Sequence, residues 1–282
     1  MLPATIIDYF WLCLAAVLAG GVNALAGGGT LLTFPTLIGV LSRQMNDELA
    51  KVFANGTSTT ALVPASLGSA WAFRRELFHL RRFLVWLLPP SLIGATIGTL
   101  LVTRLPAAYF GALVPWLILA AAVLFTVQPY LTKRKPQVVA SDEGEVCDSQ
   151  TPIPPRSLAG MIVLQLLISI YGGYFGAGIG ILMLSGLGMM GLSNIHQMNG
   201  LKAVLGTAIN GVAAIIFVAE GKLVWTYALA MMVTSLAGGY LAAHFSRQVP
   251  GRFVRWLVIV IGFCLATYYF WKQFGLSTGG AS

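Results

Sequence analysis

The feature that most constrains this chain is its succession of long apolar stretches. A helix needs about 20 apolar residues to cross the roughly 30 Å of hydrocarbon in a bilayer, because each residue rises about 1.5 Å. Eight stretches approach or reach that length and two are shorter. The ten are 6–26, 30–41, 52–73, 83–103, 107–129, 158–175, 179–192, 200–219, 223–243 and 253–271. The pattern predicts an all-α integral membrane protein with eight to ten transmembrane segments.

The composition leads to the same fold class. Hydrophobic residues make up 57% of the 282 residues and charged residues only 9%, whereas about a quarter of the residues of an average soluble protein are charged. Too few polar side chains remain to cover a soluble protein of this length, which excludes a soluble enzyme and a disordered chain. We attribute the net charge of +8 to membrane topology and not to nucleic-acid binding, because basic residues gather in cytoplasmic loops.

One polar stretch, residues 131–157, divides the chain. It contains three consecutive basic residues (133–135), then four acids, and after them three closely spaced prolines (152, 154 and 155). This composition is typical of a solvated linker. We therefore predict a first membrane repeat at 1–130, a cytoplasmic polar linker at 131–157 and a second membrane repeat at 158–282.

The two halves repeat each other in sequence. At an offset of 144 residues the matches are Asn55 with Asn199, Glu76 with Glu220, Gly94 with Gly238 and Pro106 with Pro250. Upstream the offset is 152, where Gly28 matches Gly180 and Gly39 matches Gly191. Ordered matches that include Asn, Glu and Pro are harder to obtain by chance than matched glycines. We infer an internal duplication.

The basic residues predict how the two repeats are oriented. Arginines and lysines cluster at 74–82, 133–156 and 247–255, and we place these clusters in the cytoplasm. If both short stretches cross the membrane, each half crosses five times and the halves start on opposite sides. Re-entrant short stretches would put the 244–253 loop on the wrong side. We therefore predict inverted repeats, the arrangement by which many secondary transporters build alternating access.

Glycine clusters precede both short stretches, at Gly27-Gly28-Gly29-Thr30 and within Gly172–Gly180. Glycine adopts positive φ at little cost, and a helix that begins at such a break directs unpaired N–H groups and the positive end of its dipole toward it. We predict glycine-broken helices whose breaks bind an anion through Gly27, Gly28, Gly29, Thr30, Gly176, Gly178 and Gly180. The alternative is that these glycines serve close helix packing.

A second candidate group opens two apolar stretches. Asn55, Thr57 and Ser58 lie at the start of one, and Asn199 and Lys202 lie at the start of its repeat partner. Asn, Ser and Thr at such positions can cap a helix start. Lys202 aligns with Ser58, and a lysine inside hydrocarbon costs about 2.5–3.5 kcal/mol on insertion scales. We predict that Lys202 binds an anion, although a lysine can also extend to the membrane surface.

The remaining polar residues suggest no further chemistry. Neither glycine cluster continues into the Gly-Lys-Ser/Thr of a nucleotide loop, so we expect no ATPase activity. Glu76 and Glu220 lie beside basic residues, and we expect surface ion pairs there. The three cysteines lie far apart. We predict no enzyme activity, no cofactor and no metal site.

The quoted residues resemble a known family. The Ala26–Pro35 and Asn55–Ala70 stretches, Gly172–Gly180 and Lys202 are similar to the TauE/SafE sulfite-exporter family of membrane permeases. The resemblance covers nearly the whole chain outside the linker. It implies transport of small anions such as sulfite, organosulfonates or carboxylates, in either direction. Some members carry a lysine in both repeats, whereas this chain has Ser58 in the first.

These arguments together predict a multi-pass permease of the inner (plasma) membrane. It would move a small anion by alternating access. Its expected partners are the anionic solute and the lipid bilayer, and a homo-oligomer is a further option. The alternatives are an anion channel of the same architecture and a membrane enzyme or the membrane subunit of a larger complex. A cation carrier fits poorly, because cation relays usually need intramembrane carboxylates.

Overall fold

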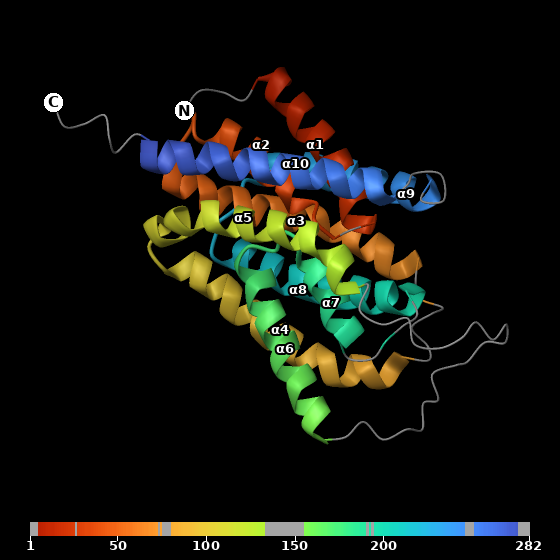
Figure 1. The fold of residues 1–282 in the computed structure, drawn as a ribbon. Helices are drawn as coiled ribbons and strands as arrows, with labels where there is room; N and C mark the ends of the chain where they lie inside the picture. The colour runs from red at the N-terminus through yellow and green to blue at the C-terminus, as the bar shows by residue number, and fades with distance from the viewer. Residues whose placement is uncertain are drawn as a thin grey trace.

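The computed structural model describes residues 5–25, 27–72, 74, 80–132, 155–189, 192, 195–245 and 251–275. Within these ranges every regular element is helical, which confirms the all-α prediction (Figure 1). The α-helices are α1 (Ile6–Leu25), α2 (Thr30–Leu41), α3 (Asp47–Ala72), α4 (Arg81–Arg104), α5 (Ala107–Thr132), α6 (Pro155–Tyr174), α7 (Ile179–Met189), α8 (Ile195–Ala219), α9 (Trp225–Phe245) and α10 (Gly251–Phe270). A short π-helix, η2 (Trp271–Gly275), follows α10.

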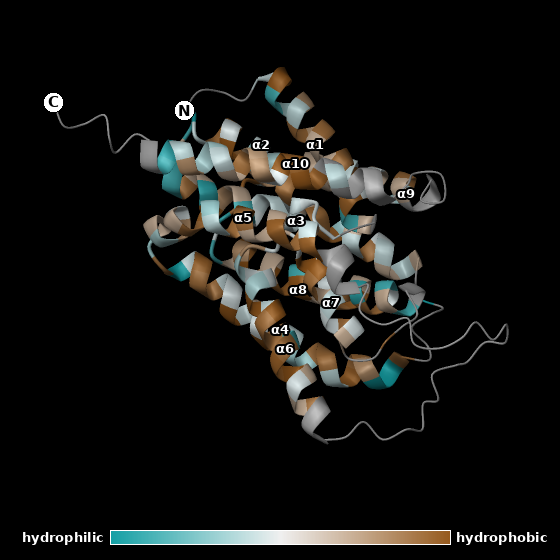
Figure 2. Ribbon diagram, in the orientation of Figure 1, coloured by the Kyte–Doolittle hydropathy of each residue, from teal (hydrophilic) through white to brown (hydrophobic). Residues whose placement is uncertain are grey.

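The helices have the lengths and surfaces of a membrane protein. Four of them, α1, α4, α5 and α8, contain described stretches that are long and apolar enough to cross a bilayer. The two short stretches form α2 and α7, which have only 12 and 11 residues. Large apolar side chains remain exposed on outward faces, such as Ile215 at 70% and Val233 at 71%. Figure 2 shows hydrophobic residues along most of the helices, and outward-facing apolar side chains are what lipid contact requires.

The first two helices form an antiparallel hairpin. Arg43, which follows the end of α2, forms an ion pair of 3.2 Å with Asp8 in the first turn of α1. The chain therefore enters the molecule along α1, turns at the glycine break and returns along α2 to the face where it began.

Other helix ends meet at that same face. Arg104 at the end of α4 pairs with Glu220 after α8 at 3.1 Å, and Lys272 after α10 pairs with Asp47 at the start of α3 at 2.5 Å. We call the surface formed by Asp8, Arg43, Asp47, Arg104, Glu220 and Lys272 the ion-pair face. Glu220 thus forms the surface ion pair expected from the sequence. Glu76 lies outside the described residues, as do residues 133–154 of the linker.

Long helices pack closely through glycine. Helix α1 packs against α9, and α4 packs against α6, a pair that crosses in Figure 1. A Cβ at Gly238 of α9 would overlap the carbonyl oxygen of Val17, and one at Gly98 of α4 would overlap that of Ile170. Small residues let membrane helices approach to backbone contact, so at these positions glycine serves packing.

This packing makes Gly238→Ala destabilising. The added methyl group must push α1 and α9 apart, and overpacking of this kind costs about 1–3 kcal/mol. We expect a clearly lowered melting temperature of the detergent-solubilised protein, measured by tryptophan fluorescence. The control is Gly211→Ala in α8, where an added Cβ meets no described atom within 4 Å and alanine favours the helix. Equal melting temperatures for the two variants would contradict this packing.

Candidate functional site

Both glycine breaks predicted from the sequence are present, and they meet. Gly27 lies between α1 and α2 with φ of 74°, and Gly176 and Gly178 lie between α6 and α7 with φ of 74° and 76°. The amide of Gly180 donates a hydrogen bond of 3.2 Å to the carbonyl oxygen of Gly27. The two breaks thus contact each other directly, although about 150 residues separate them in the sequence.

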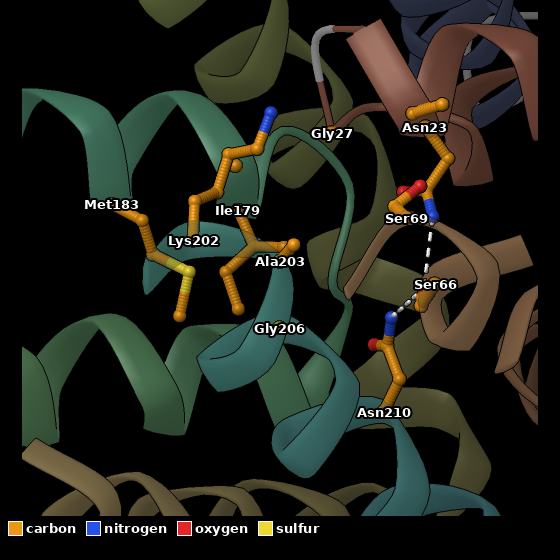
Figure 3. Close-up of a pocket in the computed structure, with 12 residues that line it drawn as sticks. Asn23, Gly27, Ser66, Ser69, Ile179, Met183, Lys202, Ala203, Gly206 and Asn210 are labelled. Atoms are coloured by element: carbon orange, nitrogen blue, oxygen red, sulfur yellow. Dashed lines mark hydrogen bonds between the residues drawn. The ribbon is translucent and has the colours of Figure 1, made fainter. Parts of the chain in front are cut away.

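A pocket lies beside this contact (Figure 3). Together with the open solvent at its mouth, it contains about 360 Å³ of space that no atom fills. It is lined by Asn23, Ala24, Gly27, Ser66, Ser69, Ile179, Gly180, Met183, Lys202, Ala203, Gly206 and Asn210. These residues come from α1, α3, α7, α8 and the first break, so both halves of the chain build the pocket.

Lys202 is the charged group of the pocket. Lys202 lies two turns inside α8 and is only 5% exposed. Its Nζ has no hydrogen-bond partner among the described residues. The pocket lining contains no Asp or Glu. This burial does not fit a lysine that extends to the membrane surface. An ammonium group in such surroundings attracts an anion, because an unpaired buried charge is costly.

A hydrogen-bonded polar cluster lies across the pocket from Lys202 (Figure 3). Ser66 Oγ accepts hydrogen bonds from Asn23 Nδ2 at 2.9 Å and from Asn210 Nδ2 at 3.4 Å. It also donates one of 3.1 Å to the carbonyl oxygen of Leu62. The cluster ties α1, α3 and α8 together.

This cluster is not among the residues predicted from the sequence. Asn23, Ser66, Ser69 and Asn210 are polar residues inside apolar stretches, which is a signal for an intramembrane site. Ser66 and Asn210 are also 144 residues apart, the offset that aligns the two repeats. Two polar residues at equivalent positions of the two repeats are therefore a second sequence signal for this site.

The structure brings three of the predicted binding residues to the pocket, namely Gly27, Gly180 and Lys202. The other nine lie outside its lining: Gly28, Gly29, Thr30, Asn55, Thr57, Ser58, Gly176, Gly178 and Asn199. Gly28 and Gly178 adjoin the ring of Phe125, and Gly29 is the N-cap of α2.

Three of these nine form hydrogen bonds to other parts of the protein. Asn55 Nδ2 donates to the Tyr174 carbonyl oxygen at 2.9 Å, and Thr57 Oγ1 accepts from the Val224 amide at 3.1 Å. The Ser58 hydroxyl bonds that of Thr33. The capping role that the sequence suggested for Asn55 and Asn199 is wrong, because both lie inside helices that begin at Asp47 and Ile195. The apolar stretches start later than the helices do, because the first turns of both helices contain charged and polar residues.

The pocket lies far from the ion-pair face. Along α8, Lys202 is separated from Glu220 by about 27 Å at 1.5 Å per residue. A buried aromatic cluster of Phe34, Phe110 and Phe175 extends from the second break to the start of α5, with ring centroids 5.2 Å apart for Phe34 and Phe175. Among the described residues no group of His, Cys, Asp and Glu is arranged to hold a metal ion.

The chain is similar to several known proteins. A family described as "Sulfite exporter TauE/SafE" matches residues 12–269. A probable membrane transporter protein of Haemophilus influenzae is 26% identical over 90% of this chain and 91% of its own length. The probable membrane transporter protein ORF9 of a Sinorhizobium species is 24% identical over 91% of this chain and 90% of its own length. YfcA of Escherichia coli K12, also named a probable membrane transporter protein, is 23% identical over 92% of this chain and 88% of its own length. No solved structure matches the chain.

Proposed function

This chain belongs to the sulfite exporter TauE/SafE family, and from that premise we propose that it is a secondary transporter that moves a small anion across the cytoplasmic membrane by alternating access. The observation that carries the proposal is the Lys202 ammonium group, which is buried and unpaired in a pocket built from both halves. The relatives are membrane transporters by name, and transport requires no covalent chemistry.

The charge of the pocket supports an anionic solute. Lys202 supplies three N–H donors and a positive charge, and the Asn23 and Asn210 amides supply further N–H groups. Since no carboxylate lines the pocket, a bound anion would stabilise the ammonium group without competition. The family description names sulfite, and sulfite, an organosulfonate or a small carboxylate would each suit the Lys202 ammonium group.

The arrangement of helices supports two inverted repeats. Helix contacts come in matched pairs when each element is exchanged for its repeat partner: α1 packs on α9 as α6 packs on α4, and α3 packs on α9 as α8 packs on α4. The first half begins at the ion-pair face with α1, and the second half ends there after α10. We place the linker and the basic clusters at the opposite, cytoplasmic face.

Contacts between the halves support alternating access. The Arg104–Glu220 and Asp47–Lys272 ion pairs and the hydrogen bond of 2.7 Å from Gln44 to the Tyr227 hydroxyl all join the two halves at the ion-pair face. The aromatic cluster lies beneath them. In our proposal this conformation is closed to the outside, and rocking of one half against the other breaks these contacts to admit the solute.

The proposed orientation predicts which face a thiol reagent reaches. In a variant whose native cysteines are replaced by serine, Lys222→Cys should react with a membrane-impermeant maleimide added to intact cells, because it lies next to the ion-pair face. Arg82→Cys at the start of α4 should react only after the cells are opened. The readout is the mass shift of the purified protein. The reverse pattern would overturn the orientation.

Flux measurements test the proposed function. Purified protein in proteoliposomes should accumulate radiolabelled sulfite, taurine or acetate with saturable kinetics, and uptake should accelerate when unlabelled solute is trapped on the far side. A thermal-shift screen against small anions selects the solute, because a bound ligand raises the melting temperature. Unitary currents in planar bilayers would instead support the anion channel, and absence of any anion binding or flux would contradict the proposal.

A further inference from the structure

We propose that Asn23 and Asn210, held in place by Ser66, form a second, uncharged subsite that binds a neutral polar group of the transported solute. The inference rests on the proposed function, since it concerns the same pocket. It adds that the solute has two ends, an anionic group at Lys202 and a hydroxyl or similar group at the two amides.

The hydrogen bonds of Ser66 indicate that it positions the two amides. Its hydroxyl proton is donated to Leu62, and its oxygen accepts one N–H from each asparagine. Both lone pairs and the proton are therefore in use, which leaves no capacity for a solute. Ser66 itself is 5% exposed, so its role is to fix the side chains of Asn23 and Asn210.

The two asparagines keep unused hydrogen-bonding groups. An asparagine amide has two N–H donors and one carbonyl acceptor, and each side chain uses a single N–H for Ser66. Both residues are half-buried and line the pocket. A second N–H and a carbonyl oxygen on each can thus face a solute, and this combination of donor and acceptor suits a hydroxyl group.

The pocket separates the amides from the lysine. Asn210 follows Lys202 by eight residues, or about 12 Å along α8, and lysine side chains in helices lean toward the N-terminus, away from Asn210. Figure 3 shows Lys202 on one side of the pocket and the asparagines on the other. Ala203, Gly206 and Ile179 also line the pocket. We infer that an anion with a short carbon chain and a terminal hydroxyl uses both sides of the pocket, whereas a compact oxyanion uses the Lys202 side alone.

Matched ligand pairs test the subsite. We would measure affinities of ethanesulfonate against 2-hydroxyethanesulfonate, and of propionate against 3-hydroxypropionate, by calorimetry on the purified full chain. The wild type should bind the hydroxylated member about three- to tenfold more tightly, as expected for neutral hydrogen bonds. Ser66→Ala should remove this preference while binding of the plain anion persists, and Ser66→Thr, which restores a hydroxyl, should recover it.

Further variants separate positioning from general damage. Thr36→Ala is the matched control, because it removes a hydroxyl that bonds only its own helix at Leu32 outside the pocket, and the preference should persist. If Ser66→Ala does not yield folded protein, Asn210→Ala removes one amide directly and should also lower the preference.

The outcomes for the two proposals differ. Equal binding of both members of each pair by the wild type would overturn the subsite and leave the anion site intact. An unchanged preference in Ser66→Ala would overturn the positioning role of Ser66. If the wild type binds none of the four anions but still binds sulfite or another anion of the thermal-shift screen, only the subsite is overturned. Absence of any anion binding or flux would overturn the proposed function, and this inference with it.

Discussion

Lys202→Ala should abolish saturable anion uptake and weaken anion binding about 10- to 100-fold. Hydrogen bonds to charged groups contribute about 1.5–3 kcal/mol, and each 1.4 kcal/mol corresponds to a factor of ten in affinity. Lys202 carries the charge of the pocket, so its loss leaves only neutral donors. Uptake of the selected radiolabelled anion in proteoliposomes and its affinity by calorimetry provide the measurements.

Two companion variants make this prediction specific. Lys202→Met keeps the length of the side chain but removes an unpaired buried charge, so the ligand-free protein should melt at a higher temperature while uptake is lost. Such opposite effects would exclude misfolding as the cause. Lys222→Ala, a lysine between α8 and α9 outside the pocket, should leave uptake unchanged. Undiminished uptake in Lys202→Ala would remove the lysine from the mechanism.

Gly27→Ala should cause the second large effect, a loss of both stability and uptake. Gly27 has φ of 74°, where a side chain costs about 1–2 kcal/mol. An added Cβ would also lie 2.5 Å from the Cα atom of Gly180, and overpacking adds about 1–3 kcal/mol. The two breaks must separate, which disturbs the hydrogen bond from Gly180 to Gly27 and the adjoining pocket. Melting temperature and uptake are the measurements.

Gly221→Ala is the matched control for the backbone conformation alone. Gly221 also has positive φ, at 63°, but an added Cβ there meets no described atom within 4 Å. The control should therefore lose only the stability that a side chain at positive φ costs, and it should retain uptake. If the two variants lose equal stability, direct contact between the breaks is not important for the fold.

The two halves differ at the position that carries the charge. Ser58 is the repeat equivalent of Lys202, and its hydroxyl is buried against Thr33. A neutral hydroxyl with a local partner needs no solute, whereas the unpaired ammonium group does. We therefore propose one anion site per chain, placed on the second half, in place of a symmetric pair of lysines.

The sequence by itself determined the helices and their breaks. Residues 30–41, chosen for their apolar character, coincide with α2, and the glycine clusters coincide with the breaks at Gly27 and at Gly176–Gly178. These features depend on local chemistry, because hydrocarbon solvent requires apolar helices and glycine allows positive φ. The charge of Lys202 inside an apolar stretch was equally visible.

Only the tertiary structure decided which of the candidate residues share a pocket. Asn55, Thr57 and Ser58 are polar residues inside an apolar stretch, as Ser66 and Asn210 are. The first three bond neighbouring backbone or hydroxyl groups, whereas the last two line the pocket. Likewise Arg104 pairs with Glu220 across 116 residues of sequence. The physical reason is that a single sequence specifies the apolar character of each helix but not its rotation or its neighbour, and these depend on how all ten described helices pack together.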